Sequence, residues 1–503
     1  MKKYLCIILT LVLVTAALSS CAPKESGSPE PSASATSSPE LTPTLEPTPT
    51  IAPTPTPTPL ATVSEAIAIC ERAGITTGAN GYHGGHQPRI CHTDHGTYIA
   101  FVSYESGGKY YFYIVKTDAD NNATVLYQDW CPYDAALVNV AADTNGDVYV
   151  ATFPINKLNG GKIPEIAWLA LYRIDAETDK VTEYKKEQQM GAISANGFGY
   201  SQPVFDFENR KIYAMYNGGN KPGMLSWFTF DMNDMKWLDS NYTVQTDILR
   251  HAYMYCFPDG NGGVVMIANR DIPTGLVDLE FEPNKNPNKP PRPKYADYVW
   301  DQLDMIIIPD LTKESYSSIV IHEADYSRGS EGIAPNVTNN QLGDAFMDAD
   351  GRLHILYTVR MLNYNLYNGD PDGIISEEMR HAIYEGTKCI YNEPIDFAIT
   401  DANMLKKINY AMRMAQSKSG NLYIFAVPMD GRLAPRQVEI YRATDALGTE
   451  FVRESITEFE NIGVSIASFS VSCPRNGSFQ DDVIDCMLFK GGDEIYTFKV
   501  KIY

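Results

Sequence analysis

The sequence lacks a surplus of positive charge, and this absence narrows the classes of function. It holds 41 Lys and Arg against 62 Asp and Glu, for a net charge of −21. Binding to nucleic acid needs a basic surface that displaces counterions from phosphates, so we exclude it. Apart from one N-terminal run, the chain also lacks long hydrophobic stretches, which excludes a protein with several membrane-spanning helices. With 44% hydrophobic and 20% charged residues, the chain has the composition of a folded protein.

Paired cysteines at metal-binding spacing are also missing. The chain has nine cysteines but no Cys-x-x-Cys pair, which excludes the usual structural zinc site. Seven cysteines follow the N-terminal region: Cys70, Cys91, Cys131, Cys256, Cys389, Cys473 and Cys486. Because seven is an odd number, at least one of these thiols cannot pair with another and is free. Cys473 and Cys486 are spaced to bridge two strands of a hairpin, and buried free thiols are the alternative.

Four histidines lie close together but do not predict a metal site. They are His83, His86, His92 and His95. Residues three apart in a strand point to opposite faces, so neither His-x-x-His pair converges on one ion. We expect no metal and no cofactor.

The N-terminus has the pattern of an export signal. Lys2 and Lys3 precede an apolar run from Tyr4 to Leu18, which is too short to span a bilayer comfortably. The sequence Leu18-Ser19-Ser20-Cys21 that follows resembles a bacterial lipobox. This resemblance implies a signal peptide over residues 1–20, lipid attachment to Cys21, and anchoring on the extracytoplasmic face of the cell membrane. An ordinary cleaved signal with an incidental cysteine is the alternative.

The next segment, residues 21–60, has the composition of a tether. Eleven of the 31 prolines lie between Ala22 and Leu60, alternating with Thr near its end. Such a segment buries little apolar surface and favours an extended polyproline conformation, with a reach of roughly 120 Å at ~3.1 Å per residue. The folded domain is therefore expected over residues 61–503.

A repeat runs through this domain. Each copy has a polar turn rich in Gly or Asn, an apolar strand, and a further strand that in most copies ends in Asp. One copy has the turn Asp143-Thr144-Asn145-Gly146, which Val148 to Val150 follow. The turns recur at positions 96, 146, 209, 260, 351, 420 and 477, about 63 residues apart on average. Short strands grouped in units of this length predict an all-β fold, a β-propeller of seven four-stranded blades, with six or eight blades as alternatives.

The chain ends just after the third strand of the last copy, which leaves that blade without its outer strand. The segment Thr62 to Thr77 follows the tether and is predicted to supply the missing strand, which would close the ring without a free edge. A short helix from Val63 to Cys70 is the alternative.

Long connections in two copies suggest where a ligand binds. The link from Asp271 to Tyr298 and the link from Met361 to Glu378 are both predicted to reach the end of the channel at which the first strands begin. Polar residues at the starts of the first strands and beside the second link are the candidate ligand-binding residues: His86, Gln87, Gln202, Arg360, Arg380, His381, Tyr410 and Arg413. The candidate catalytic residues are Arg250, His251, Tyr253 and Asp344.

The phrase from Met347 to Tyr357, with its Asp-x-Asp-Gly turn before an apolar strand, resembles the repeat of sialidase-like propellers of the bacterial neuraminidase-repeat type. The resemblance implies a fold that glycoside hydrolases, polysaccharide lyases and non-catalytic modules share. The Ser-x-Asp-x-Gly-x-Thr-Trp box of sialidases is absent.

Two functions follow from these residues. In the first, the propeller binds a glycan, a cell-wall polymer or a protein at its central funnel, where Arg pairs with carboxylates and Tyr stacks on sugar rings. In the second, it is a surface polysaccharide lyase or glycoside hydrolase. A lyase would use His251 or His86 with Tyr253 as base and acid, and Arg250 or Arg380 would neutralise a uronate carboxylate. A hydrolase would need two carboxylates, of which Asp344 is the one candidate.

Overall fold

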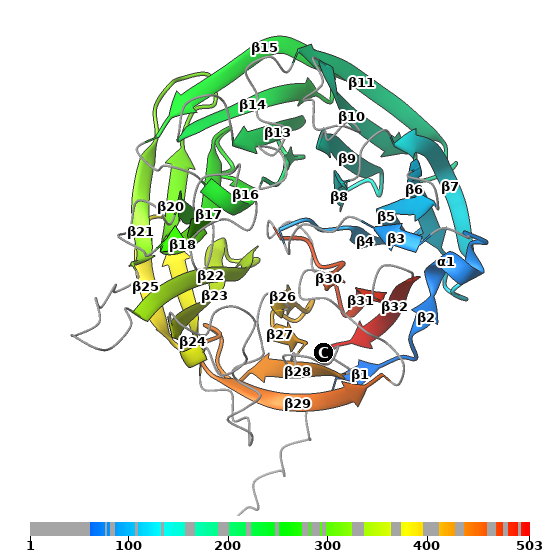
Figure 1. Ribbon diagram of the computed structural model, residues 1–503. Helices are drawn as coiled ribbons and strands as arrows, with labels where there is room; N and C mark the ends of the chain where they lie inside the picture. The colour runs from blue at the N-terminus through cyan, green and yellow to red at the C-terminus, as the bar shows by residue number, and fades with distance from the viewer. Residues whose placement is uncertain are drawn as a thin grey trace, which may run out of the picture. The chain divides into compact units, whose positions relative to one another are not determined.

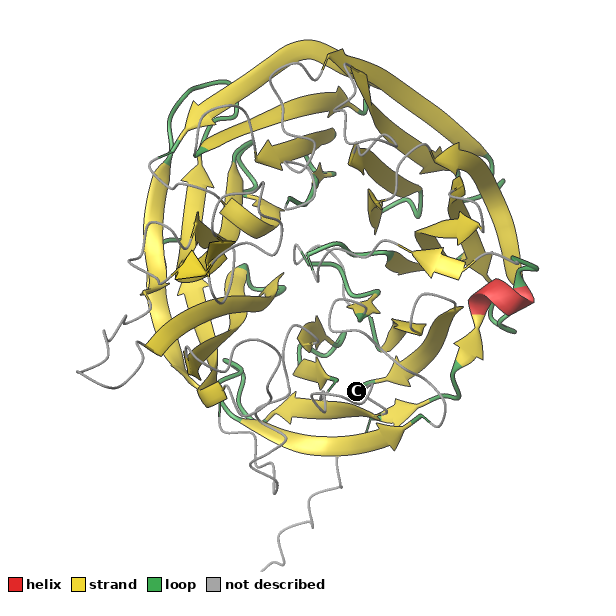
Figure 2. Cartoon of the chain, viewed as in Figure 1, coloured by secondary structure: helices red, strands yellow, loops and turns green. Residues whose placement is uncertain are grey.

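A computed structural model gives the fold of this chain, and its folded unit runs from Thr58 to Tyr503. The structure describes residues 61–75, 78–80, 86–105, 109–131, 135–155, 166–189, 201–217, 223–246, 251–273, 281–282, 292–293, 298–323, 336–363, 374–395, 412–427, 437–459, 469–475, 481–490 and 494–503. Antiparallel sheets stand in a ring around a central axis (Figure 1). Almost all of the ordered elements are strands (Figure 2). No helix in the described part of the chain is long and apolar enough to cross a membrane.

The described strands form seven blades, as the repeat predicts. Blade 1 contains β3 (Gly78–Asn80), β4 (Ile90–Thr93), β5 (Gly96–Glu105), β6 (Lys109–Thr117) and β7 (Ala123–Cys131). Blade 2 contains β8 (Ala135–Ala142), β9 (Val148–Ile155), β10 (Ile166–Ile174) and β11 (Val181–Gln189). Blade 3 contains β12 (Val204–Asp206), β13 (Lys211–Asn217), β14 (Met224–Asp231) and β15 (Lys236–Gln245). Blade 4 contains β16 (His251–Pro258), β17 (Val264–Pro273), β20 (Tyr298–Ile308) and β21 (Ser317–Glu323), with the small hairpin β18 (Phe281–Glu282) and β19 (Arg292–Pro293) between β17 and β20.

The remaining three blades follow the same order from inner to outer strand. Blade 5 contains β22 (Asn336–Met347), β23 (Arg352–Asn363), β24 (Ile374–Glu385) and β25 (Lys388–Pro394), and blade 6 contains β26 (Met412–Gln416), β27 (Leu422–Ala426), β28 (Gln437–Ala443) and β29 (Phe451–Glu458). Blade 7 contains β30 (Ser470–Val471), β31 (Val483–Lys490) and β32 (Glu494–Lys501), with β1 (Thr62–Val63) and β2 (Ile67–Ala68) at its outer edge.

Both ends of the domain build blade 7, which confirms the predicted closure. Thr62 pairs with Lys501, and Ile67 pairs with Thr497, both antiparallel. The described helix of this segment is α1 (Ile69–Arg72), directly after these strands. Because the last sheet takes its outer edge from the start of the domain, the ring has no open edge at this junction.

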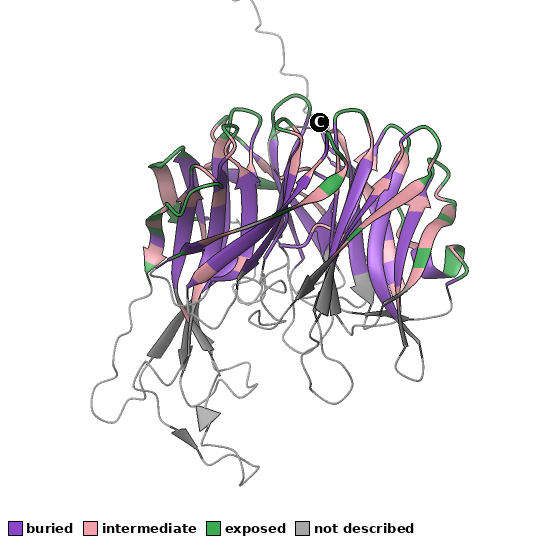
Figure 3. Ribbon diagram, turned by 90° about the horizontal axis from the view of Figure 1, so that it is seen from above, coloured by how far each residue is buried: buried purple, intermediate pink, exposed green. Residues whose placement is uncertain are grey.

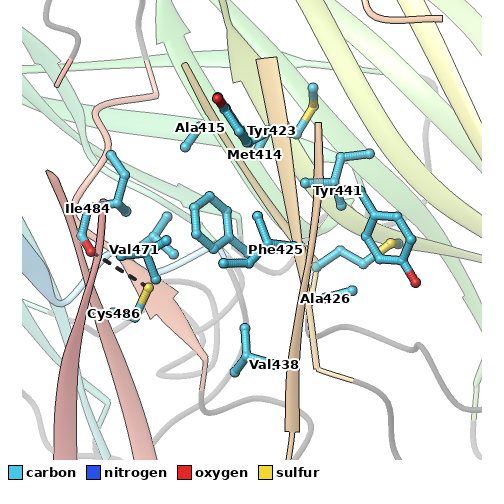
Figure 4. Close-up of a cluster of buried hydrophobic side chains, with 14 of the residues drawn as sticks. Met414, Ala415, Tyr423, Phe425, Ala426, Val438, Tyr441, Val471, Ile484 and Cys486 are labelled. Atoms are coloured by element: carbon cyan, nitrogen blue, oxygen red, sulfur yellow. Dashed lines mark hydrogen bonds between the residues drawn. The ribbon is translucent and has the colours of Figure 1, made fainter. Parts of the chain in front are cut away.

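Alternating apolar side chains build the contacts between blades. Inner and middle strands are buried, whereas the turns along one face are exposed (Figure 3). Between blades 6 and 7, Phe425 packs among Val438, Val471 and Ile484 (Figure 4). Cys486 belongs to the same cluster as a free thiol, and burial raises its pKa well above its ordinary value.

Cys473 is also a free, buried thiol, so the two cysteines do not bridge. This outcome agrees with the buried-thiol alternative. Both side chains fill space between blades as small apolar groups.

The two faces of the propeller differ. The turns between first and second strands lie on one face, which we call the turn face: residues 94–95, 143–147, 207–210, 259–263, 348–351 and 417–421. The strands are antiparallel, so the first strands begin at the opposite face, where β17 ends and β20 begins. The predicted long links leave from this opposite face, and most of their residues lie outside the described part of the chain.

Blade 1 departs from the repeat in a way that positions the site. Its inner edge is shared by β3 and β4, which both pair with β5, and residues 86–89 lie outside the sheet directly before β4. This excursion is held from two sides, since Val140 N–H donates to the Pro88 carbonyl at 2.8 Å and Arg89 N–H donates to Ser470 Oγ at 3.4 Å. The loop before β4 therefore reaches the middle of the ring (Figure 2).

The junction between blades 1 and 7 contains an ionisable pair. His92 Nδ1 lies 2.8 Å from Asp485 Oδ2, and Thr97 Oγ donates to the same carboxylate oxygen at 2.8 Å. The hydrogen bond with Asp485 is the largest cause of a raised pKa at His92, against an opposing effect of burial.

This pair predicts a pH-dependent stability. A raised pKa means that the pairing stabilises the fold below the unfolded pKa of about 6.5 and that this stabilisation is lost as the pH rises through the folded value. We therefore expect His92→Gln to lower the melting temperature more at pH 6 than at pH 8.5, measured by thermal unfolding of both proteins. An equal loss at the two pH values would contradict this account.

Candidate functional site

Aromatic and imidazole side chains from two blades meet in the middle of the ring. The His86 ring, from the excursion before β4, stands edge-on to Tyr253 of β16, with 5.6 Å between centroids and 70° between planes. Tyr255 lies 6.4 Å from the same imidazole, and Trp300 of β20 stands edge-on to Tyr253 at 5.3 Å. His86 is fully buried, whereas Tyr253 and Trp300 are partly exposed. We call these four residues, with Gln87, Arg89 and Arg413, the central cluster.

Tyr253 has a backbone conformation that L-residues seldom adopt in a strand. Its φ is +55°, in the left-handed region. The other described non-glycine residues with positive φ are all in turns: Asn121, Asp179, Arg210 and Met235. The register between β16 and β17 shifts between Ala252 and Tyr255, so Tyr253 occupies a β-bulge. Left-handed backbone at a bulky residue costs on the order of 1–2 kcal/mol, and such strain concentrates at functional sites.

Two further members of the central cluster converge on one carbonyl. Tyr255 Oη donates to the Gly343 carbonyl at 3.0 Å, and Arg413 Nη1 donates to the same oxygen at 3.1 Å. A side chain at Gly343 would approach Met412 Cε to 2.9 Å, so glycine permits this close approach of β22 and β26. The guanidinium of Arg413 is thereby fixed beside Tyr255. The three residues belong to β16, β22 and β26, the inner strands of blades 4 to 6 (Figure 1).

The candidate carboxylate Asp344 is held inside the protein. It is fully buried, Arg475 Nη1 lies 2.9 Å from its Oδ2, and Met414 N–H donates to the same oxygen at 2.7 Å. Burial raises the pKa of Asp344, while the charges of Arg475 and Arg413 lower it. These contacts join blade 5 to blades 6 and 7, and we assign Asp344 to that connection.

Gln202 and His251 also connect neighbouring blades. Gln202 Oε1 accepts a 3.0 Å hydrogen bond from the Cys256 backbone, which links blade 3 to blade 4. His251 Nε2 lies 2.9 Å from Thr246 Oγ, and that hydroxyl lies 2.8 Å from the Gly223 carbonyl. The hydroxyl donates to the carbonyl, so it accepts a hydrogen bond from the N–H at His251 Nε2.

The candidates on β23 and β24 lie in the sheet of blade 5, away from the central cluster. Arg380 Nε donates to Tyr357 Oη at 3.0 Å, and its Nη2 donates to the Asn392 carbonyl at 2.8 Å. His381 is fully buried, with Nε2 3.0 Å from His354 Nδ1, and burial lowers its pKa well below the ordinary value. Arg360 pairs with Asn339 and Glu377 in the sheet.

Arg250, Tyr410 and Cys21 lie outside the described residues. Of the other candidates, the structure brings His86, Gln87, Tyr253 and Arg413 into the central cluster. The sequence reasoning missed Arg89, Tyr255 and Trp300. Arg89 and Tyr255 each lie within three residues of a named candidate, and this closeness in sequence could have identified both of them.

A cavity of about 770 Å³ occupies the middle of the ring on the turn face. Pro88 and Gln202 line its inner part. Acidic turn residues line its mouth: Asp94, Asp143, Asp206, Glu208 and Asp259. Asp143, Asp206 and Asp259 accept backbone hydrogen bonds of their own turns, which accounts for their presence there. Within the described ranges, no group of three or more metal-ligating side chains is found.

Comparison with known proteins adds information at the level of the fold. No protein-family model matches the sequence, and no curated protein matches it. The crystal structure of the polysaccharide lyase Uly1 is 9% identical, with a TM-score of 0.50 over 88% of this chain and 99% of that chain. An ulvan lyase of polysaccharide lyase family PL25, bound to a GlcA(1-4)Rha3S unit, gives 11% identity and a TM-score of 0.49 over 84% and 93% of the two chains. Penicillium chrysogenum α-L-arabinanase gives 7% and 0.39 over 72% and 92%. The propeller fold of this chain is thus one that the polysaccharide lyase Uly1 also has.

Proposed function

We propose that this chain is a membrane-anchored surface protein that binds an anionic polysaccharide at the central cluster and cleaves it by β-elimination. The observation that carries the proposal is the contact of His86 with Tyr253, a tyrosine held in strained backbone at a β-bulge. A phenol beside an imidazole supplies the two types of group that exchange protons with a substrate near neutral pH. Strain at a reacting residue is consistent with a fixed orientation of its side chain.

The chemistry of a uronate matches these groups. Tyr253, as phenolate, takes the C5 proton of the uronate, and the electron pair of the C5–H bond forms the C4=C5 double bond. The C4–O bond then breaks, and the leaving oxygen takes the proton from Tyr253. The imidazole of His86 beside the phenol favours the phenolate, because a hydrogen-bond donor close to the phenol oxygen stabilises negative charge there.

Positive charge near Tyr255 supports a ligand that bears carboxylates. Arg413 is almost fully buried and fixed by two backbone carbonyls, those of Gly343 and Met412. In a chain with a net charge of −21, the buried guanidinium groups of Arg89 and Arg413 make the surroundings of the central cluster more favourable for an anion than the rest of the protein. The polysaccharide lyase Uly1 has the same fold, and this supports polysaccharide as the class of ligand.

The test is a screen of the purified protein for eliminative cleavage. Substrates are uronate homopolymers and a polymer of alternating glucuronate and sulfated rhamnose, and the readout is ultraviolet absorbance of the unsaturated product. We expect an increase with at least one polymer. Tight binding of a polymer without product would contradict cleavage and support the alternative, a non-catalytic binding propeller whose Tyr253 and Trp300 contact sugar rings.

Membrane attachment through Cys21 is part of the proposal, based on the lipobox-like sequence before it. In a bacterial host, we expect Cys21→Ala to abolish labelling with a fatty-acid analogue and to release the processed protein from the membrane fraction. Cys389→Ala, at an exposed cysteine of the propeller, is the matched control and should remain labelled. Labelling of the Cys21→Ala variant would contradict lipid attachment at this position.

A further inference from the structure

The buried side chains of Arg89, Gln87 and His86 form a short hydrogen-bonded chain, which we call the relay, and His86 at its end contacts Tyr253. Arg89 Nη2 donates to Gln87 Oε1 at 3.2 Å, and Gln87 Nε2 lies 3.4 Å from His86 Nε2. All three side chains are fully buried. They come from one segment, which the backbone bonds to Val140 and Ser470 hold between blades 2 and 7.

The donors in this relay fix the orientation of the Gln87 amide. A guanidinium has only donors, so the amide atom that faces Arg89 is the oxygen. The amide nitrogen therefore faces His86. An amide NH₂ also only donates, so Nε2 of His86 accepts this hydrogen bond. A neutral histidine that accepts at Nε2 carries its proton on Nδ1.

We propose that Gln87 is a positioning residue that holds His86 as the neutral, Nδ1-protonated tautomer, and that Arg89 sets the orientation of Gln87. This inference rests on the proposed function for its catalytic meaning. A second proton would have to add at Nε2, where it would face the amide NH₂ and break the contact with Gln87. The relay thus disfavours the imidazolium, and His86 serves the reaction as a neutral hydrogen-bond donor while Tyr253 transfers the proton.

The charged and titratable groups around His86 are compatible with this role. Arg89 lies on its own segment, and its positive charge also disfavours a charged imidazole. From β16, Tyr253 and Tyr255 face the ring. From β26, Arg413 reaches the Gly343 carbonyl that Tyr255 also contacts. No carboxylate is among these described neighbours of the ring.

The tautomer can be measured directly. The full chain has eight histidines, so ¹⁵N-histidine labelling of the detergent-solubilised protein gives few ring signals, and His86→Gln identifies those of His86 by their loss. We expect a protonated Nδ1 and an unprotonated Nε2 at neutral pH. A proton on Nε2 in the wild-type protein would overturn the inference, with or without enzymatic activity.

Substitution of Gln87 tests the cause. A carboxylate accepts where the amide donates, so Gln87→Glu should move the proton to Nε2 and raise the titration midpoint of His86 by about one pH unit. Gln87→Met, which removes the donor at similar volume, should give a mixture of tautomers. Gln128→Glu makes the same change at an exposed position on β7 and should leave the His86 signals unchanged. Unchanged signals in both Gln87 variants would refute the positioning role.

The same proteins separate this inference from the proposed function. If His86 has the expected tautomer but no uronate polymer is cleaved, the role of Gln87 stands and the lyase proposal fails. If a polymer is cleaved, the acid limb of the pH–rate profile should shift with the His86 midpoint in Gln87→Glu. A profile that does not follow that midpoint would contradict the part of the inference that links Gln87 to the reaction.

Discussion

Tyr253→Phe is expected to reduce cleavage of the polysaccharide by about 10²- to 10⁴-fold, the usual contribution of a positioned acid–base group. The substitution removes one hydroxyl group and keeps the ring that packs edge-on against His86 and Trp300. Affinity for the polymer should change little, since stacking and shape are retained. The measurement is the initial rate of formation of the unsaturated product, beside the binding affinity for the same polymer.

A matched control separates this effect from the loss of any tyrosine hydroxyl. Tyr391 is partly buried on the outer strand β25, and its hydroxyl makes a single 3.4 Å contact with the Thr449 carbonyl. Tyr391→Phe should therefore retain the wild-type rate. If Tyr253→Phe cleaves as fast as the wild type, Tyr253 does not transfer the proton and the mechanism proposed for the central cluster fails.

His86→Gln extends the same test. Glutamine keeps a hydrogen-bonding group of similar length but loses the imidazole ring that packs in a T-shaped arrangement against Tyr253. If His86 only donates a hydrogen bond to the reacting centre, this variant should lose less activity than Tyr253→Phe. A larger loss for His86→Gln would indicate that the imidazole itself transfers a proton.

The sequence was sufficient to predict the ring and its closure. Turns such as Asp143 to Gly146 recur because each blade needs the same reversal between its first two strands, and the recurrence of these turns favoured seven blades over six or eight. The outer strand from Thr62 to Val63 followed from the unfinished last copy, because an open sheet edge is unfavourable. Both features depend on local patterns that the chain repeats.

The central cluster could be predicted only in part, because its geometry depends on irregularities. The starts of the first strands identified His86, Gln87, Tyr253 and Arg413 by their shared position at one end of the channel. The bulge between Ala252 and Tyr255 changes the direction of the side chains that follow in β16. The residue pattern of this strand does not predict the bulge.

Pairings between distant residues were also hidden in the sequence. Asp344 and Arg475 lie in different blades, and no pattern in the sequence predicts that their side chains form an ion pair. A buried ion pair therefore resembled an isolated catalytic carboxylate. The contact of Trp300 with Tyr253 was missed for the same reason, since it depends on how β20 packs beside β16.

Asp344→Ala is expected to destabilise the propeller by about 3–5 kcal/mol, the usual cost of removing one partner of a buried ion pair. The change leaves the guanidinium of Arg475, which is 9% exposed, without its carboxylate, and it leaves the Met414 N–H without its acceptor. Asp344→Asn should cost less, because an amide oxygen can still accept from Met414. Chemical unfolding of the three proteins measures these differences.

The control is an exposed pair on the outside of the ring. Asp310 lies 2.6 Å from Lys313, with side chains 34% and 71% exposed, and Asp310→Ala should destabilise the propeller much less than Asp344→Ala does. The comparison also decides the role of Asp344. If Asp344→Asn has the stability of the wild type and loses polysaccharide cleavage, then Asp344 is a reacting carboxylate and not a connection between blades. A hydrolase would then fit the site better than a lyase, because eliminative cleavage by Tyr253 needs no carboxylate from the protein.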